Sequence, residues 1–194
     1  MSPKEIVRCP WPGNNPLMMK YHDEEWGVPL HDDRKWFEVI VLDGMQAGLS
    51  WQTIINKREN FRKAFDRFDP KKVAKYGAGD FNRLMADAGI VRNRAKITAA
   101  IVNAQRFLEV QKEFGSFDSY IWQFTGGKPI VNSMRSLKDF QATSKESDAM
   151  SKALLGRGFK FVGSTICYAC MQAAGMVNDH TVDCFRYKEI NRMR

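Results

Sequence analysis

The most informative absences in this sequence of 194 residues concern long apolar runs and cysteine. No apolar stretch approaches the roughly 20 residues of a transmembrane helix, which excludes an integral membrane protein. Residues 1–5 are polar and no long apolar run follows them, so no signal peptide is expected. Four cysteines do not make the disulfide framework of a small secreted domain. We therefore expect a cytoplasmic protein with reduced thiols.

The sequence also lacks internal repeats, low-complexity tracts and the alternating apolar pattern of a β-strand. Instead, apolar residues recur at helical spacing between glycines, prolines and N-cap candidates, as in Trp36, Phe37, Ile40 and Val41. These patterns predict an all-α fold. The length and the 44% hydrophobic content are sufficient for one sizeable core. We expect residues 1–194 to form a single compact unit.

Acidic residues are the scarcer charged class. The sequence has 22 Asp and Glu against 30 Lys and Arg, which gives a net charge of +8 and a pI of about 9.4. A basic balance favours an anionic partner, of which nucleic acid is the commonest large example. Many basic proteins bind no polyanion, so the charge alone does not establish this partner.

The stretch at residues 42–51, LDGMQAGLSW, lies between two segments of helical spacing. Its glycines, Gly44 and Gly48, predict a break in the helix, because glycine is costly inside a helix and favourable in a bend. Asp43 lies at one edge of the stretch and Trp51 at the other. A carboxylate close to an indole can bind a flat, hydrogen-bonding ring. The alternative is an interhelical turn with Trp51 in the core and Asp43 in solvent.

Four residues from the two ends of the chain are candidate metal ligands. His180 and Cys184 form an H-x3-C pair, a one-turn spacing that lets both side chains reach one ion. Together with Cys9 and His22 they make a Cys2His2 set, which is chemically suited to tetrahedral zinc. Such a site would hold the N-terminal arm against the C-terminal tail. The spacing is not that of a zinc finger, and the alternative is unrelated histidines and buried thiols.

A tight turn at residues 88–96 separates a short helical segment from a longer one that begins at about Arg94. Arg92, Arg94 and Lys96 surround this helix N-terminus. Exposed amides, the positive end of a helix and basic side chains suit a phosphate group. Helix-hairpin-helix DNA-binding motifs have this layout, although their usual second glycine is missing here. The alternative is an ordinary helical hairpin.

The N-terminal arm is rich in aromatic residues for a loop, with Trp11, Tyr21 and Trp26. If the metal ligands hold the arm over the 42–51 stretch, these rings and Asp43 line one pocket. Aromatic faces with a carboxylate fit a nucleobase that has been rotated out of a DNA duplex.

Several long, ungapped motifs make the sequence similar to a known family. They are YHDEEWGVP at residues 21–29, QAGLSW at 46–51, KREN at 57–60, DAGI at 87–90, RGFKFVG at 157–163 and VNDH at 177–180. Over nearly the whole chain, the sequence resembles the DNA-3-methyladenine glycosylase I family of bacterial alkyladenine glycosylases.

This resemblance implies a fold of the helix-hairpin-helix DNA glycosylase superfamily, with a zinc clip joining the N- and C-terminal segments. It implies a structural Zn²⁺ ion bound by Cys9, His22, His180 and Cys184. It also implies base excision repair, in which 3-methyladenine is removed from alkylated double-stranded DNA and an abasic site is left.

The resemblance places the base pocket at Tyr21 and Trp51, with Trp11 and Trp26 beside them. Asp43 recognises the base in this interpretation. The expected DNA contacts are Gly48, Leu49, Gly89, Arg92, Arg94 and Lys96. Asp43 stands where the family usually has glutamate, and Met18 where the better-known members have an aromatic residue. Both departures leave the rate and the substrate range open.

We expect monofunctional hydrolysis of an N-glycosidic bond. Methylation at N3 puts positive charge on adenine and makes it a good leaving group, and aromatic faces favour a cationic ring. The sequence shows no general base and no lysine recognisable as a Schiff-base nucleophile, so no lyase activity is expected. The alternatives are a glycosylase with another alkylpurine preference and a non-catalytic, zinc-clipped DNA-binding module. A monomer is expected, since DNA needs only one face.

Overall fold

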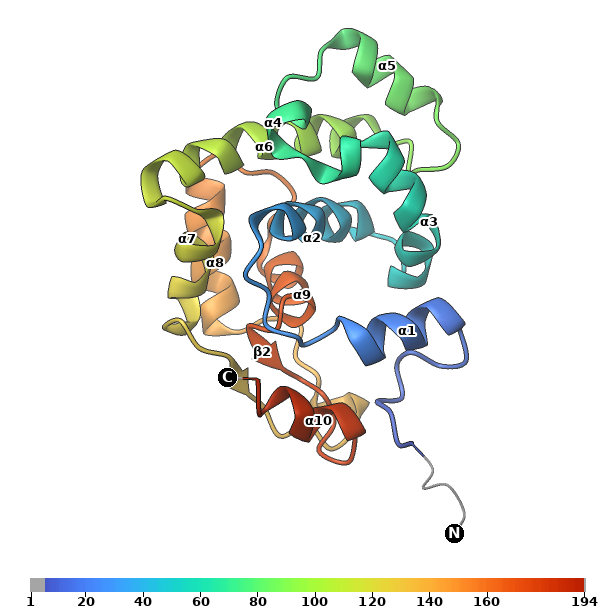
Figure 1. Cartoon of the computed structure of the whole chain (residues 1–194), viewed down its shortest axis with the longest axis vertical. Coiled ribbons are helices and arrows are strands. Elements are labelled where there is room, and N and C mark those ends of the chain that lie inside the picture. The colour runs from blue at the N-terminus through green and yellow to red at the C-terminus, as the bar shows by residue number, and fades with distance from the viewer. Residues whose placement is uncertain (1–5, 194) are drawn as a thin grey trace.

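The structure, a computed structural model, describes residues 6–193 and is mostly helical (Figure 1). Residues 1–5, on which the expectation of no signal peptide partly rests, lie outside this range, as does Arg194. The α-helices are α1 Pro16–Glu24, α2 Asp33–Gln46, α3 Trp51–Ala64, α4 Pro70–Val73, α5 Ala78–Ala86, α6 Arg94–Phe114, α7 Phe117–Ile121, α8 Lys145–Gly156, α9 Ser164–Ala173 and α10 Phe185–Ile190. Short 3-10 helices are η1 Asp66–Phe68, η2 Trp122–Thr125 and η3 Leu137–Asp139. The predicted helical class is confirmed.

Two very short strands depart from the all-α prediction. Strand β1, Ile130–Val131, pairs in parallel with β2, Val177–Asn178. An isolated bridge between Met134 and Thr181 continues the pairing. The pairing attaches the segment after η2 to the C-terminal part of the chain. Strands of two residues carry no alternating pattern, so the sequence offers no signal for them.

Helix α2 lies at the centre of the main core and packs against α3, α6, α7 and α9 (Figure 1). The apolar residues predicted at helical spacing, Trp36, Phe37, Ile40 and Val41, are all buried. A helix that is apolar on most sides is stable only when neighbours cover it, as they do here. Within residues 6–193, no helix is both long enough and apolar enough to cross a membrane.

The predicted helix break at Gly44 is wrong. Helix α2 continues through Gly44 to Gln46, and the bend follows at Ala47. A Cβ at Gly44 would lie 3.6 Å from the Cβ of Phe161, an ordinary van der Waals contact, so Gly44 is buried against this neighbour without a steric need for glycine. Packing and continued helical hydrogen bonds outweigh the cost of glycine, about 1 kcal/mol. Gly48, with a φ of +73°, lies in the bend itself.

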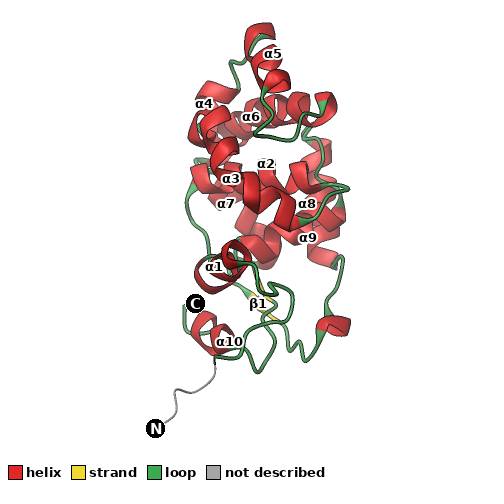
Figure 2. Ribbon diagram, turned by 90° about the vertical axis from the view of Figure 1, so that its right-hand side faces the viewer, coloured by secondary structure: helices red, strands yellow, loops and turns green. Residues whose placement is uncertain are grey.

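Helix α1 was not predicted, because its apolar residues show no convincing helical period. It begins at an N-cap, where the side chain of Asn15 accepts hydrogen bonds from the amides of Leu17 and Met18 at 3.0 and 3.1 Å. Pro16 occupies the first helical position, where its missing N–H costs nothing. The Asn-Pro pair is therefore the sequence signal for this helix. Figure 2 shows α1 and α10 at the end of the molecule opposite α5.

Gly175, which lies just after α9, is expected to tolerate replacement by alanine poorly. Its φ is +67°, and a Cβ built on it would lie 2.4 Å from the carbonyl carbon of Val28 and 2.5 Å from the nitrogen of Pro29. Gly175→Ala should lower the free energy of unfolding by about 3 kcal/mol, because the clash involves backbone and φ is unfavourable for alanine. Thermal or urea unfolding measures this loss.

The control is Gly156→Ala in α8, where a Cβ would have no neighbour within 4 Å. Alanine is a better helix former than glycine, so this variant should be as stable as the parent chain or slightly more stable. Equal stability of the Gly156→Ala and Gly175→Ala variants would contradict the close approach of the two chain segments.

Candidate functional site

Four aromatic residues that the sequence placed at a pocket lie together. The ring of Trp11 is 5.0 Å from that of Trp26 and 6.3 Å from that of Tyr21, measured between centroids. Tyr21, from α1, is 5.1 Å from Trp51, the first residue of α3. Ser50 fixes the start of α3, because its side chain accepts a hydrogen bond from the amide of Thr53. The arm and the bend therefore meet at one aromatic cluster.

These rings surround a cavity of about 180 Å³, which we call the aromatic cavity. It is lined by Trp11, Tyr21, Trp26, Asp43, Gln46, Trp51, Phe140, Ala169 and Gln172. Drug-sized ligands occupy roughly 300–1,000 Å³, so this cavity suits a single small heterocycle. Three of its polar atoms are buried without a hydrogen-bond partner among residues 6–193: Trp11 Nε1, Asp43 Oδ2 and Trp51 Nε1. Because such atoms each cost about 1–3 kcal/mol, their presence on three lining residues favours a site for a hydrogen-bonding ligand.

Asp43 lies in the last turn of α2 and is only 3% exposed. Burial raises the pKa of its carboxyl group to about 7, while the neighbouring Cys170 thiol and the positive charge of Arg58 oppose this rise. The carboxyl group is therefore close to half-ionised at neutral pH. A cationic ligand in the cavity would favour its charged form.

A second cavity, of about 440 Å³, shares Tyr21, Asp43 and Trp51 with the aromatic cavity. Most of its charged groups are already paired, although Lys35 and Asp43 have no ion pair among the described residues. Arg58 donates to Glu25 at 2.7 Å and to Glu38 at 2.6 Å, and Arg62 lies 2.8 Å from Glu38. These satisfied ion pairs leave little for a polar ligand to recognise. The aromatic cavity is therefore the better candidate for the functional site.

Several lining residues have no counterpart in the sequence predictions. Gln46, Ala169 and Gln172 contribute from α2 and α9, and Phe140 stacks on Trp26 with ring planes inclined by 10°. Gln46 belongs to the QAGLSW motif, which is a usable signal. Phe140 comes from an irregular segment without any pattern, so only the tertiary structure could place it.

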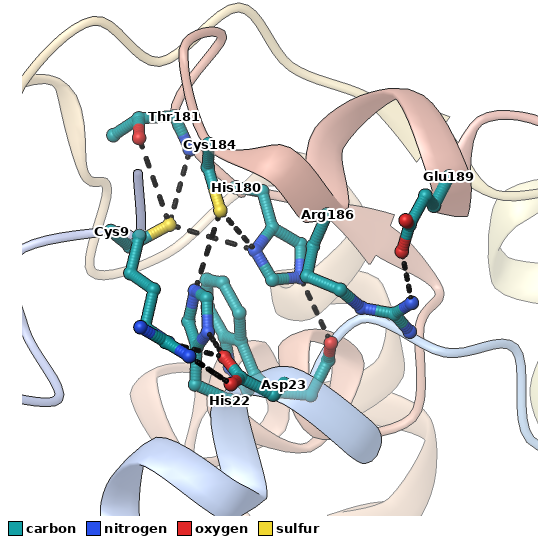
Figure 3. A network of polar contacts seen from close by, with 10 residues as sticks. Cys9, His22, Asp23, His180, Thr181, Cys184, Arg186 and Glu189 are labelled. Carbon is teal, nitrogen blue, oxygen red and sulfur yellow. Dashed lines mark hydrogen bonds and ion pairs between the residues drawn. The ribbon is translucent and has the colours of Figure 1, made fainter. Parts of the chain in front are cut away.

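The four predicted metal ligands, Cys9, His22, His180 and Cys184, are buried together (Figure 3). Their donor atoms all lie within 4.8 Å of one another. Cys184 Sγ is 3.5 Å from His22 Nε2 and 3.5 Å from His180 Nδ1. Cys9 Sγ is also 3.5 Å from His180 Nδ1. This group can hold a metal ion.

The other nitrogen of each histidine has a fixed partner. His22 Nδ1 is 2.8 Å from the carboxylate of Asp23, and His180 Nε2 is 3.0 Å from the carbonyl oxygen of Trp26. Such outer partners orient imidazole ligands of metals. The Cys9 thiol and the two imidazoles lower the pKa of the Cys184 thiol, which favours the thiolate form that binds metals.

The hairpin between α5 and α6 exposes Arg92 and Arg94 at the start of α6. The guanidinium of Arg94 lies 4.9 Å from the ring centre of Phe81. The amide of Gly89 donates to the side chain of Asp87 at 2.7 Å and is therefore not free for a phosphate. Leu49, in the bend beside the aromatic cavity, is 42% exposed.

Lys96 does not fit the predicted phosphate contact. It is only 8% exposed, and its ammonium group donates to the carbonyl oxygens of Met45 at 2.8 Å and Ala47 at 2.6 Å. Burial lowers the pKa of this ammonium group. The side chain is directed under the bend after α2 because these carbonyls lack helical partners.

Comparison with known proteins identifies the family. The sequence profile of the methyladenine glycosylase family matches residues 11–187. The chain belongs to this family. DNA-3-methyladenine glycosylase 1 of Escherichia coli is 50% identical over 182 residues, which are 94% of this chain and 97% of that protein. DNA-3-methyladenine glycosylase of Haemophilus influenzae is 48% identical over 92% of this chain and 96% of its own length.

Solved structures of methyladenine glycosylases share the fold. A crystal structure of 3-methyladenine DNA glycosylase I has a TM-score of 0.90 and 49% identity, over 92% of this chain and 98% of that one. Another solved structure, of 3-methyladenine DNA glycosylase I from Staphylococcus aureus, was described for the structural basis of its 3-methyladenine recognition. It has a TM-score of 0.89 and 35% identity, over 92% of this chain and 95% of that one. The family resemblance predicted from the sequence motifs is confirmed.

Proposed function

We propose that this methyladenine glycosylase removes 3-methyladenine from alkylated double-stranded DNA by hydrolysing its N-glycosidic bond, and leaves an abasic site. The aromatic cavity with its three unpartnered polar atoms carries this proposal. The names of the Escherichia coli and Haemophilus influenzae relatives support it. A further neighbour, 35% identical, was crystallised in complex with 3-methyladenine.

The cavity provides the groups that a cationic purine requires. Tyr21, Trp11 and Trp51 offer aromatic faces and edges to the ring, and a cation is attracted to such faces. The Asp43 carboxylate accepts hydrogen bonds from the base and favours its positive charge. Neutral adenine lacks this charge, so it gains less from the same carboxylate. The site therefore discriminates between damaged and normal adenine through electrostatics.

Hydrolysis at this site does not require the enzyme to protonate the leaving base, because the methylated base is already cationic. Water attacks the sugar carbon while the cavity binds the departing base. Among the described residues, the lining of the aromatic cavity contains no lysine. We therefore propose a monofunctional hydrolase that forms no Schiff base with the sugar.

The DNA is held, in this proposal, by the helix-hairpin-helix formed by α5, the turn and α6. Arg92 and Arg94 contact phosphates beside the N-terminus of α6, where the helix dipole favours negative charge. The bend at Gly48 and Leu49 enters the gap left by the extruded nucleotide. The net charge of +8 suits this polyanionic partner.

The metal site is proposed to hold structural zinc. With Zn–S bonds of about 2.3 Å and Zn–N bonds of about 2.0–2.1 Å, a tetrahedral ion separates sulfur from nitrogen by about 3.5 Å. Three of the four sulfur–nitrogen distances at the site are 3.5 Å. Four protein ligands leave no open position, as in structural rather than catalytic zinc sites. When bound, the ion fastens the arm that carries Trp11 and Tyr21 to the C-terminal segment.

Release of free bases from methylated duplex DNA, resolved by chromatography, tests the proposed activity. Release of 3-methyladenine supports it. Release of mainly another purine keeps the enzyme class and changes the substrate. DNA binding without any release identifies the non-catalytic module that the sequence left open.

The activity is expected to rise with pH around neutrality. The ionised form of Asp43 attracts the cationic base, and burial places the pKa of this carboxyl group at about 7 in the free enzyme. Because kcat/KM reports ionisations of the free enzyme, its pH profile should increase through a midpoint near that value. Burial raises the pKa of Tyr21 and Cys170 well above their ordinary values, so these neighbours stay neutral in this range. The measurement is the initial rate of base release between about pH 5.5 and 8.5.

Asp43→Asn is the control, since asparagine does not titrate. Its residual activity should be independent of pH over this range. A wild-type profile that stays flat, or that falls as pH rises, would contradict the role of the ionised carboxylate.

A further inference from the structure

Lys96 connects two parts of the molecule that are far apart in the sequence. It is the third residue of α6, and its backbone amide donates to the N-cap side chain of Asn93 at 3.1 Å. Its ammonium group reaches across to the carbonyl oxygens of Met45 and Ala47 at the end of α2. One side chain therefore joins the DNA-binding hairpin to the bend beside the aromatic cavity.

The carbonyls that Lys96 binds belong to a helix end that needs a cation. The last turn of α2 contains no basic residue, and its terminal carbonyls have no helical partners. The C-terminus of a helix carries partial negative charge, so an ammonium group there is favourable. Because Lys96 is buried, its charge is compensated by these carbonyls rather than by water. The contact therefore requires a positively charged hydrogen-bond donor that points at these two carbonyl oxygens.

The bend has little other support from outside its own helices. Its internal hydrogen bonds run from the amide of Ala47 to Gly44 O at 3.4 Å and from the amide of Leu49 to Gln46 O at 2.6 Å. Between residues 6 and 193, no other side chain from outside α2 and α3 hydrogen-bonds to residues 45–50. The Lys96 contact thus holds the backbone of Met45 and Ala47, which lie just before Gly48 and Leu49 in the chain.

We propose that Lys96 is a positioning residue that couples seating of the hairpin on DNA to the conformation of the Gly48–Leu49 bend, and so promotes extrusion of the base. This inference rests on the proposed glycosylase function. Lys96 acts through the bend and touches neither DNA nor base. Arg92 and Arg94 remain the cations that face the phosphates.

Salt dependence separates this role from a phosphate contact. Each phosphate contact adds about 0.9 to the slope of log affinity against log salt for duplex DNA. Removing a buried ammonium group that never meets phosphate leaves this slope unchanged. Removing a positioning residue instead slows the step that follows binding.

The test uses Lys96→Met, which keeps the length of the side chain without its charge, and Lys96→Gln, which keeps a neutral donor if the first variant folds poorly. Lys112→Met is the matched control, because Lys112 is an exposed lysine near the other end of α6. Three quantities are measured: the single-turnover rate of 3-methyladenine release, the affinity for undamaged duplex at several salt concentrations, and quenching of tryptophan fluorescence by free 3-methyladenine. The last reports whether the aromatic cavity is intact.

For the Lys96 variants we expect a release rate lower by about tenfold, with the salt slope and the affinity for the free base unchanged. The control should match the wild-type protein in all three measurements. An unchanged release rate overturns the proposal. A smaller dependence of DNA affinity on salt also overturns it, because Lys96 would then be a phosphate contact. Loss of free-base binding in both variants overturns it as well, because the role of Lys96 would then be purely structural.

Failure of the proposed function is recognised separately, because the wild-type protein would then release no 3-methyladenine. In that case the fluorescence of 2-aminopurine beside an abasic-site analogue in duplex DNA still reports extrusion of a base. Weaker extrusion by the Lys96 variants than by Lys112→Met would support the coupling, and equal extrusion would overturn it.

Discussion

Replacing Asp43 with asparagine is expected to reduce the release of 3-methyladenine from methylated DNA by about ten- to a hundredfold. The change keeps the size of the side chain but removes its charge. A buried hydrogen bond that involves a charged group contributes about 1.5–3 kcal/mol, and each 1.4 kcal/mol corresponds to about tenfold in rate. The loss should be large because Asp43 is buried among aromatic rings, where water screens charge poorly. Chromatography of the released bases measures it.

Asp43→Glu is the informative companion variant. It keeps the charge and lengthens the side chain by one methylene, so it should retain activity within about tenfold of the parent chain. Asp43→Asn should also remain as stable as the parent chain, because burial disfavours the charge that it removes. An asparagine variant that releases 3-methyladenine at the parental rate would remove Asp43 from the proposed mechanism.

Removing the metal is expected to detach the N-terminal arm from the C-terminal segment and to destabilise the protein by about 5 kcal/mol or more. The arm supplies Cys9 and His22, and the tail supplies His180 and Cys184. Without an ion these four buried groups keep only weak contacts with one another. For a chain of this size, the loss corresponds to a fall in Tm of about 10–20 °C. Thermal unfolding with and without a chelator measures it, and elemental analysis should find one zinc per chain.

Cys184→Ser should reproduce the effect of the chelator, while Cys167→Ala should keep its zinc. Cys167 is an equally buried cysteine, but its thiol donates to the carbonyl oxygen of Val162 at 3.2 Å and lies outside the metal group. Loss of the ion should also weaken binding of free 3-methyladenine, since the arm carries Trp11 and Tyr21. A purified protein without metal, whose Tm is unaffected by chelators, would contradict the zinc proposal.

Local sequence patterns were sufficient for much of this fold and site. Helical spacing of apolar residues predicted α2 and α6, because one buried face imposes the same period wherever it occurs. The metal ligands could be selected by chemistry, since few residue types bind zinc and His180 and Cys184 are one turn apart. The long motifs identified the family. Residue types and their short spacings were therefore enough to predict these helices, these candidate ligands and the family.

Other features depended on contacts between distant segments. Gly44 is a helix breaker by propensity, yet it is helical and buried inside α2, which packs against several other helices. Lys96 has the composition and position of a phosphate contact, yet its ammonium group is buried under a bend about fifty residues earlier. Phe140 joins the aromatic cavity from a segment without a pattern. By itself the sequence determined most of the helices, the candidate metal ligands and the family. Only the tertiary structure decided what each buried polar or aromatic side chain contacts, because burial and partner choice depend on packing between segments that no local period records.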